Sequence, residues 1–165
     1  MNRLILFRHG RAERDSASGD DFDRRLETSG RDESAAMAAT LADLGFAPDL
    51  VLVSAAVRTR ETWAALEGCF PKTQARFEPS LYLADEGVIR QAAEAAAEGA
   101  GTVMVVGHNP GLQELTVRLL IEGSAPPSLI SRAQANFPTS AAAVFLIDAA
   151  GRPAYDGLFF PNGRR

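Results

Sequence analysis

The chain has very few of the residues on which several common chemistries depend. Its single cysteine, Cys69, excludes an intrachain disulfide and favours a reducing compartment. No neighbouring base activates this thiol, so we interpret Cys69 as a small apolar packing residue. The two histidines are too few for most metal phosphoesterase sites, and neither a His-x-His nor a His-Glu-x-x-His pattern occurs.

Long apolar runs are missing too. No run approaches the ~20 residues that span a membrane. The first run stops at Arg8 and lacks the small-residue cleavage site of a secretory signal. Proteins that bind nucleic acid or anionic membranes usually have a basic surface. The formal net charge of −4 therefore argues against general binding to either of these partners. We therefore expect a cytoplasmic protein that binds neither nucleic acid nor membranes. Any positive charge that binds phosphate must then lie inside a cleft.

What the sequence does contain is short apolar runs that end in chemically active residues. Residues 4–7 are too few for a helix and predict a buried strand. This strand leads into Arg8, His9 and Gly10, and the glycine allows a sharp turn. Ligands of α/β proteins gather outside the carboxyl ends of strands, so Arg8 and His9 are candidates for a site. Alone they could equally begin a solvated loop, because short motifs match by chance.

Two later runs end in the same way. Residues 103–106 predict a second buried strand that leads to His108, so both histidines of the chain follow apolar strands. Residues 50–53 predict a third, followed by Ser54 and then Arg58. Three strand ends thus deliver histidine and arginine, which are the donors that a phosphoryl-binding pocket needs.

Strands alternate with helical patterns along the whole chain, which predicts a single α/β domain over residues 1–165. We expect a three-layer sandwich, in which helices cover both faces of a mixed, mainly parallel sheet. The expected strands are 4–7, 50–53, 76–83 as a short edge segment, 103–106, 143–147 and 155–159. The expected helices begin near residues 28, 54, 86 and 110.

Local signals predict several helix ends and loops. Ser29 and Asp32 resemble a capping box, and Ser54 is a candidate N-cap. The proline pair within residues 123–128 predicts a loop without regular structure. The polar segment from Arg11 to Asp23 is either a rim or lid of the site or a solvated connection.

Ordered motifs along nearly the entire chain resemble the histidine phosphatase superfamily. The short length is similar to its small SixA-like branch of phosphohistidine phosphatases, which implies a phosphoglycerate mutase-like fold. The motifs are Arg8-His9-Gly10, the segment 54–62, Gly107-His108-Asn109-Pro110-Gly111, Asp23-Arg24-Arg25-Leu26 with Gly30, and Phe137-Pro138-Thr139 before the strand at 143.

The resemblance implies a role for each site residue. His9 would be the nucleophile and would carry the phosphoryl group transiently. Its other ring nitrogen must then donate to a backbone carbonyl, so that the attacking nitrogen stays unprotonated. Arg8, Arg58 and His108 would hold the phosphoryl oxygens, and Asn109 could add a donor. No metal or other cofactor is implied.

This sequence differs from the larger family members in the residue that would protonate the leaving group. Those members carry an acidic residue for this step in the segment after the second α/β unit. Asp85 and Glu86 are the nearest candidates, but their context does not clearly match, and both also fit the acidic start of a helix. Without an acid, phosphohistidine is a better substrate than an alkyl phosphate, because imidazole leaves readily.

We therefore expect a metal-independent phosphatase that acts through a phosphohistidine intermediate, with a phosphohistidine protein as its substrate. Two alternatives stay open. One is a small-molecule phosphomonoesterase of the same superfamily. The other is a phospholigand-binding regulator without turnover, although the intact set of Arg8, His9, Arg58 and His108 argues against it.

Overall fold

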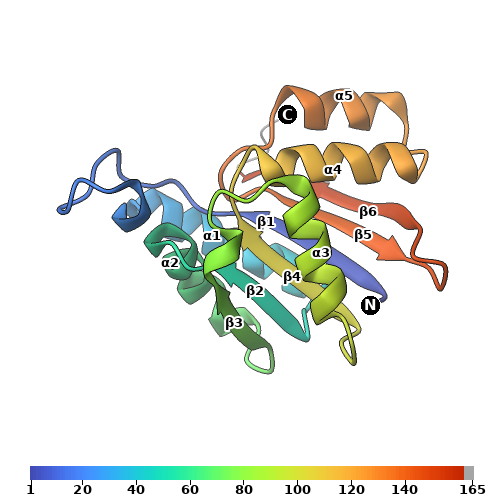
Figure 1. Ribbon diagram of the computed structural model, residues 1–165, viewed down its shortest axis with the longest axis horizontal. Helices are drawn as coiled ribbons and strands as arrows, with labels where there is room; N and C mark the ends of the chain where they lie inside the picture. The colour runs from blue at the N-terminus through green and yellow to red at the C-terminus, as the bar shows by residue number, and fades with distance from the viewer. Residues whose placement is uncertain (162–165) are drawn as a thin grey trace.

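The computed structural model describes residues 1–161, in which six strands form one sheet in the order β3-β2-β4-β1-β5-β6 (Figure 1). Strands β3, β2, β4 and β1 run parallel, whereas β5 is antiparallel to β1 and β6 is antiparallel to β5. This confirms the predicted mixed, mainly parallel sheet. The strands are β1 Arg3–Arg8, β2 Leu50–Ser54, β3 Gln74–Glu78, β4 Thr102–Gly107, β5 Ala142–Ile147 and β6 Pro153–Phe159.

Helices cover both faces of the sheet, because the buried strands are apolar on both sides. Leu4 and Leu6 point to the face that α3, α4 and α5 cover, whereas Ile5 and Phe7 point to the face covered by α1 and α2. The helices are α1 Thr28–Asp43, α2 Val57–Leu66, α3 Glu86–Ala96, α4 Gly111–Glu122 and α5 Pro127–Ala135, and the 3₁₀ turns are η1 Asp21–Asp23, η2 Glu67–Cys69 and η3 Pro79–Leu81.

The register of the central strands brings the motif residues to one edge. Arg8 at the end of β1 is paired with Gly107 at the end of β4. The residues that follow, His9 and His108, therefore leave neighbouring strands side by side. Val53 of β2 pairs with Val106 of β4, which places Ser54 next to the same edge. Parallel pairing is thus what gathers three distant sequence motifs.

Three local predictions were wrong. The predicted loop at 123–128 ends earlier, because α5 begins at Pro127, and proline suits the first turn of a helix, where its missing N–H costs nothing. Helix α1 has Glu27 as its N-cap, and the described chain shows no side-chain capping bond there. Helix α2 has Ala56 as its N-cap, so Ser54 does not cap it.

Within residues 1–161, no helix combines the length and the apolar character that a membrane span requires. Cys69 is a half-buried free thiol that packs against the core formed with α1 and α2. This location agrees with the packing role expected for it.

Candidate active site

Four of the predicted site residues meet at the carboxyl ends of β1, β2 and β4. We call Arg8, His9, Arg58 and His108 the floor of the site. The two imidazole rings lie with their centroids 5.4 Å apart and their planes inclined by 56°. Arg58 projects from the first turn of α2, directly after β2, and its side chain is only 2% exposed. The floor is therefore a cluster of histidine and arginine side chains, of which His9, Arg58 and His108 are buried and Arg8 is half-buried.

Backbone geometry fixes His9. Its Nδ1 lies 2.7 Å from the carbonyl oxygen of Gly10, and its backbone N–H donates to Gly107. The Gly10 N–H in turn donates to Thr62 Oγ1 at 2.9 Å. A Cβ at Gly10 would approach the backbone oxygen of Gly30 to 2.6 Å, so this close approach requires glycine. The contact of Nδ1 with a carbonyl leaves Nε2 as the nitrogen with the free lone pair.

Burial also controls the charge of both imidazoles. It lowers the pKa of His9 to about 3 despite the opposing effect of the hydrogen bond to Gly10, and the positive charges of the two floor arginines add to the lowering. Burial, followed by the charge of Arg58, lowers the pKa of His108 to about 3 as well. Both rings are therefore neutral near pH 7, and a neutral imidazole retains the lone pair that a nucleophile needs.

A side chain orients His108. The distance between Ser54 Oγ and His108 Nε2 is 2.7 Å, and both residues are buried. The second ring nitrogen, Nδ1, is buried and has no hydrogen-bond partner in the described part of the chain. Ser54 therefore acts on the site through His108, which sequence reasoning missed because a serine after a strand also fits a helix cap.

The two floor arginines keep free N–H groups. Arg8 donates from Nη1 to the carbonyl oxygen of Phe137 at 3.1 Å, and Arg58 donates from Nη1 and Nη2 to Asp21. Among residues 1–161 the Nε atoms of both arginines are buried without a partner. Burial and the nearby charge of Arg58 lower the pKa of Arg8. Partly unpaired guanidiniums offer donors of the kind that bind anions.

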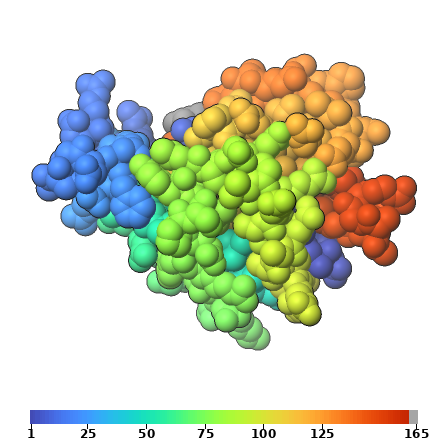
Figure 2. Space-filling model, in the orientation of Figure 1, coloured from blue at the N-terminus to red at the C-terminus, as the bar shows by residue number. Residues whose placement is uncertain are grey.

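Asp21, Phe22 and Tyr82 border this cluster, and we call them the rim. Tyr82 donates a short hydrogen bond to Asp21 Oδ2. The Tyr82 ring meets His108 edge-on with centroids 5.5 Å apart, and the Phe22 ring packs edge-on against Tyr82 with centroids 5.0 Å apart. The loop that follows β1 projects from the body beside the segment leading to α3 (Figures 1 and 2).

The rim carboxylate is firmly ionised. The hydrogen bond from Tyr82, with the positive charges of Arg24 and Arg58, holds the pKa of Asp21 well below its usual range. Sequence reasoning treated Asp21 as a solvated loop residue and did not single out Tyr82. No local pattern joins these two residues, since 61 positions separate them and only the fold brings them together.

The remaining candidates do not join the floor. Asn109 donates from Nδ2 to the carbonyl oxygen of Phe137 at 2.9 Å, the same oxygen that Arg8 contacts. Asp85 caps α3 by accepting the N–H of Val88 at 2.9 Å, which is the structural role weighed above. Glu86 forms two hydrogen bonds with Arg118, at 2.7 and 2.9 Å. Neither candidate acid is placed to serve the floor.

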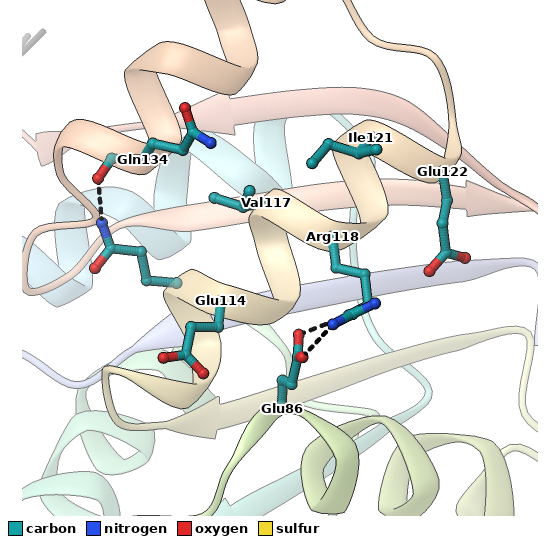
Figure 3. Close-up of a pocket in the computed structure, with 8 residues that line it drawn as sticks. Glu86, Glu114, Val117, Arg118, Ile121, Glu122 and Gln134 are labelled. Atoms are coloured by element: carbon teal, nitrogen blue, oxygen red, sulfur yellow. Dashed lines mark hydrogen bonds and ion pairs between the residues drawn. The ribbon is translucent and has the colours of Figure 1, made fainter.

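Glu86 belongs to a separate groove of about 510 Å³ along α4, which lies between α3 and α5. In Figure 3 the Glu86 carboxylate points toward Arg118, and Val117 and Ile121 form the apolar part of the groove. Its lining, all within the described chain, includes none of the four floor residues. No group of three or more His, Cys, Asp or Glu side chains able to hold a metal ion occurs in residues 1–161.

Comparison with known proteins shows the family to which the chain belongs. The sequence profile of the histidine phosphatase superfamily (branch 1) matches residues 4–82. Phosphohistidine phosphatase SixA of Escherichia coli is 32% identical over 162 residues, which cover 96% of this chain and 94% of SixA. The chain belongs to the histidine phosphatase superfamily. An uncharacterised chloroplast protein of Arabidopsis thaliana is 34% identical over 68% of this chain, and the chain spans only 56% of that protein.

Solved structures of the superfamily share the fold. A protein of Agrobacterium tumefaciens assigned to SixA superposes with a TM-score of 0.83 at 28% identity, over 97% of this chain and 98% of its own. A SixA protein histidine phosphatase in complex with tungstate superposes with a TM-score of 0.77 at 29% identity, over 96% of this chain and 97% of its own. A phosphoglycerate mutase of Plasmodium falciparum superposes with a TM-score of 0.64 at 17% identity, over 99% of this chain and 96% of its own. This likeness confirms the predicted phosphoglycerate mutase-like fold.

Proposed function

We propose that this chain is a metal-independent phosphatase that transfers a phosphoryl group from phosphohistidine, carried by a partner protein, to His9 and then to water. Residues 1–165 would form its single histidine phosphatase domain. The similarity to proteins named as phosphohistidine phosphatases supports the substrate class. Binding of tungstate, an oxyanion of phosphate-like shape, by one of these relatives supports an oxyanion pocket here.

One observation carries the proposal. Three buried nitrogens of the floor lack a hydrogen-bond partner among residues 1–161: Arg8 Nε, Arg58 Nε and His108 Nδ1. A buried polar group without a partner costs free energy, about 1–3 kcal/mol. Donors of this kind, on residues that belong to the same floor as His9, are what a bound anion would satisfy. A phosphoryl group offers three equatorial oxygens, one for each donor.

The first chemical step then uses the geometry of His9. Its Nδ1–H donates to Gly10, so the lone pair of Nε2 attacks phosphorus. The bond between phosphorus and the leaving nitrogen breaks, and its electron pair returns to that nitrogen. Water then attacks the phosphohistidine, which releases inorganic phosphate and restores His9. Arg8 and Arg58 stabilise the charge of the equatorial oxygens during both steps.

His108 acts as a neutral donor in this scheme. A hydrogen bond from Ser54 Oγ–H to Nε2 leaves the proton of the ring on Nδ1, the nitrogen without a partner. Asn109 would contribute indirectly, since its amide shares the Phe137 carbonyl with Arg8 and so fixes the setting of that arginine. We therefore propose Asn109 as a positioning residue rather than a direct phosphate ligand.

The decisive experiment compares specificity constants in excess EDTA for a phosphohistidine peptide and for a panel of sugar and glycerol phosphates. We expect turnover without a metal and a preference for the phosphohistidine peptide. If one alkyl phosphate is preferred by more than about tenfold, corresponding to about 1.4 kcal/mol, the protein is a metabolite phosphatase. Loss of activity that one divalent ion restores would contradict the metal-independent mechanism.

A further inference from the structure

Asp21 has an unusual place for a carboxylate in a pocket for phosphate. Its backbone oxygen accepts from Arg58 Nη1 at 2.8 Å, and its Oδ2 accepts from Arg58 Nη2 at 3.0 Å. The Asp21 side chain is 46% exposed, whereas that of Arg58 is 2% exposed. The carboxylate therefore contacts the buried floor through Arg58 and at the same time stays partly open to solvent.

The hydrogen bonds of Asp21 fix its chemical state. Oδ2 accepts from both Tyr82 and Arg58, and Oδ1 accepts from Arg24 Nε at 2.9 Å. A carboxylate whose two oxygens accept three hydrogen bonds, two of them from guanidiniums, holds its negative charge. Asp21 therefore has no proton to give to a leaving alkoxide, and its negative charge offsets part of the positive charge that Arg24 and Arg58 bring to the edge of the floor.

From this placement we infer that Asp21 is a specificity-determining residue, which selects phosphoryl donors whose leaving group is a protonated, cationic nitrogen heterocycle. The inference rests on the proposed phosphatase function and concerns the same site. A carboxylate attracts a cationic leaving group and repels one that gains negative charge, so the two classes of substrate are affected in opposite directions.

The charges of the reaction explain the selection. In a phosphorylated imidazole whose second nitrogen carries a proton, the ring is positive, and breaking the N–P bond returns an electron pair to give neutral imidazole. The unprotonated ring would have to leave as an anion. Asp21 favours the protonated form, and the transition state keeps part of that positive charge. In a phosphate monoester the leaving oxygen gains negative charge instead, and Asp21 opposes its departure.

The test measures the ratio of kcat/KM for N-phosphoimidazole to kcat/KM for 4-nitrophenyl phosphate. The nitrophenolate leaves without a proton, so its turnover does not depend on a proton donor at the rim. We expect Asp21→Asn to lower the ratio by about fivefold, as for the loss of a half-exposed charge pair. The expected change comes from slower cleavage of N-phosphoimidazole, with equal or faster cleavage of 4-nitrophenyl phosphate. Asp21→Glu keeps the charge and should retain most of the ratio.

Asp20→Asn is the matched control. Asp20 is the neighbouring exposed carboxylate, and no hydrogen bond joins it to Arg58 in the described chain. Its removal changes the net charge equally and should leave the ratio unchanged. Thermal unfolding of each variant shows whether the fold is kept.

Two results would overturn the inference, and they have different meanings. Equal losses on both substrates in Asp21→Asn would show that Asp21 merely holds Arg58, while the proposed phosphatase function stands. If the wild-type protein cleaves 4-nitrophenyl phosphate but not N-phosphoimidazole, the proposed substrate class fails, and the selection by Asp21 fails with it.

Discussion

The floor of the site is attached to the ends of β1, β2 and β4, whereas the rim depends on side chains that meet from distant loops. His9 is held by backbone groups of its own and the neighbouring strand, and it is 7% exposed. At the rim, Asp21 and Tyr82 meet through a side-chain hydrogen bond near the surface. Arg8, His9 and His108 are thus held by the sheet, whereas the rim, and the Arg58 guanidinium that bonds to it, depend on contacts between side chains and loops.

This difference separates two tasks. A transferring phosphoryl group must meet donors in fixed positions, and rigid strand ends supply such preorganisation. Discrimination between leaving groups needs contacts nearer to solvent, which loops supply and can vary. Changes at the floor should therefore affect every substrate, and changes at the rim should affect some substrates more than others.

The largest effect is expected at the nucleophile. His9→Gln removes the attacking nitrogen, so it should abolish the acid-labile phosphoenzyme and reduce turnover by roughly 10⁴-fold or more, as for other nucleophile deletions. Rapid-quench labelling followed by peptide mapping measures this. Label on His108 in the wild-type protein would reverse the assignment of the two histidines, and label retained in the variant would rule out His9.

The next largest effect is expected from Arg58→Ala. This substitution removes a buried donor to the equatorial oxygens and should lower kcat for every substrate by roughly 10²–10³-fold, the loss seen for one oxyanion donor. Arg60→Ala is the matched control, because Arg60 lies on the exposed side of the same helix and donates to Ala55. Equal losses in the two variants would point to a damaged helix rather than to a missing phosphate ligand.

The same contrast explains what the sequence could predict. The floor follows from local rules, since an apolar run of strand length ends directly in Arg8 and His9, and another ends before His108. The rim does not, because nothing near Asp21 in the sequence indicates that Tyr82 will donate to it. Ser54 was assigned to the wrong partner for a related reason. Its cap role competes with a contact to His108 that exists only after β2 and β4 pair.

The stability of the protein should fall in acid because of the floor. The pKa values of His9 and His108 are about 3 in the folded state, against 6.5 when unfolded. Between these values the unfolded chain binds more protons, so the free energy of unfolding decreases as the pH falls from 6.5 toward 3. Each histidine contributes a slope of about 1.4 kcal/mol per pH unit. Above pH 6.5 this contribution is complete and constant.

Urea denaturation at pH 7, 6, 5 and 4 measures this slope. The pKa of Asp21 is lowered in the folded state, so Asp21 also makes the free energy of unfolding decrease in acid. This contribution is lost only as the pH falls below the ordinary range of a carboxyl group. His108→Gln should reduce the slope around pH 5 by about half. An unchanged slope in this variant would mean that the buried ring is not neutral in the folded protein.

A smaller effect is expected from Ser54→Ala. The hydroxyl contacts His108 and not the phosphoryl group in our scheme, so its loss should let the ring turn without removing a donor. We expect kcat/KM to fall by about tenfold on aryl and N-phosphoryl substrates alike, as for the loss of one orienting hydrogen bond. A fall confined to one substrate class would place Ser54 in leaving-group selection instead.

The smallest effect is expected from Tyr82→Phe. The substitution removes the hydroxyl that donates to Asp21, but it keeps the ring that packs against His108 and Phe22. Asp21 remains ionised, since Arg24 and Arg58 still bind it. Kinetics with 4-nitrophenyl phosphate should therefore change by less than about threefold, because exposed polar contacts are worth little.

Tyr82→Ala should be compared with Tyr82→Phe, because it also removes the ring beside His108. The same ring packs against the Arg58 guanidinium, whose carbon lies 5.8 Å from the ring centroid. It should cost more than Tyr82→Phe on every substrate, because it disturbs two floor residues at once. If Tyr82→Phe alone lowers aryl phosphate turnover as much as Ser54→Ala, the rim takes part in phosphoryl transfer itself. The division between a rigid floor and a selective rim would then be wrong.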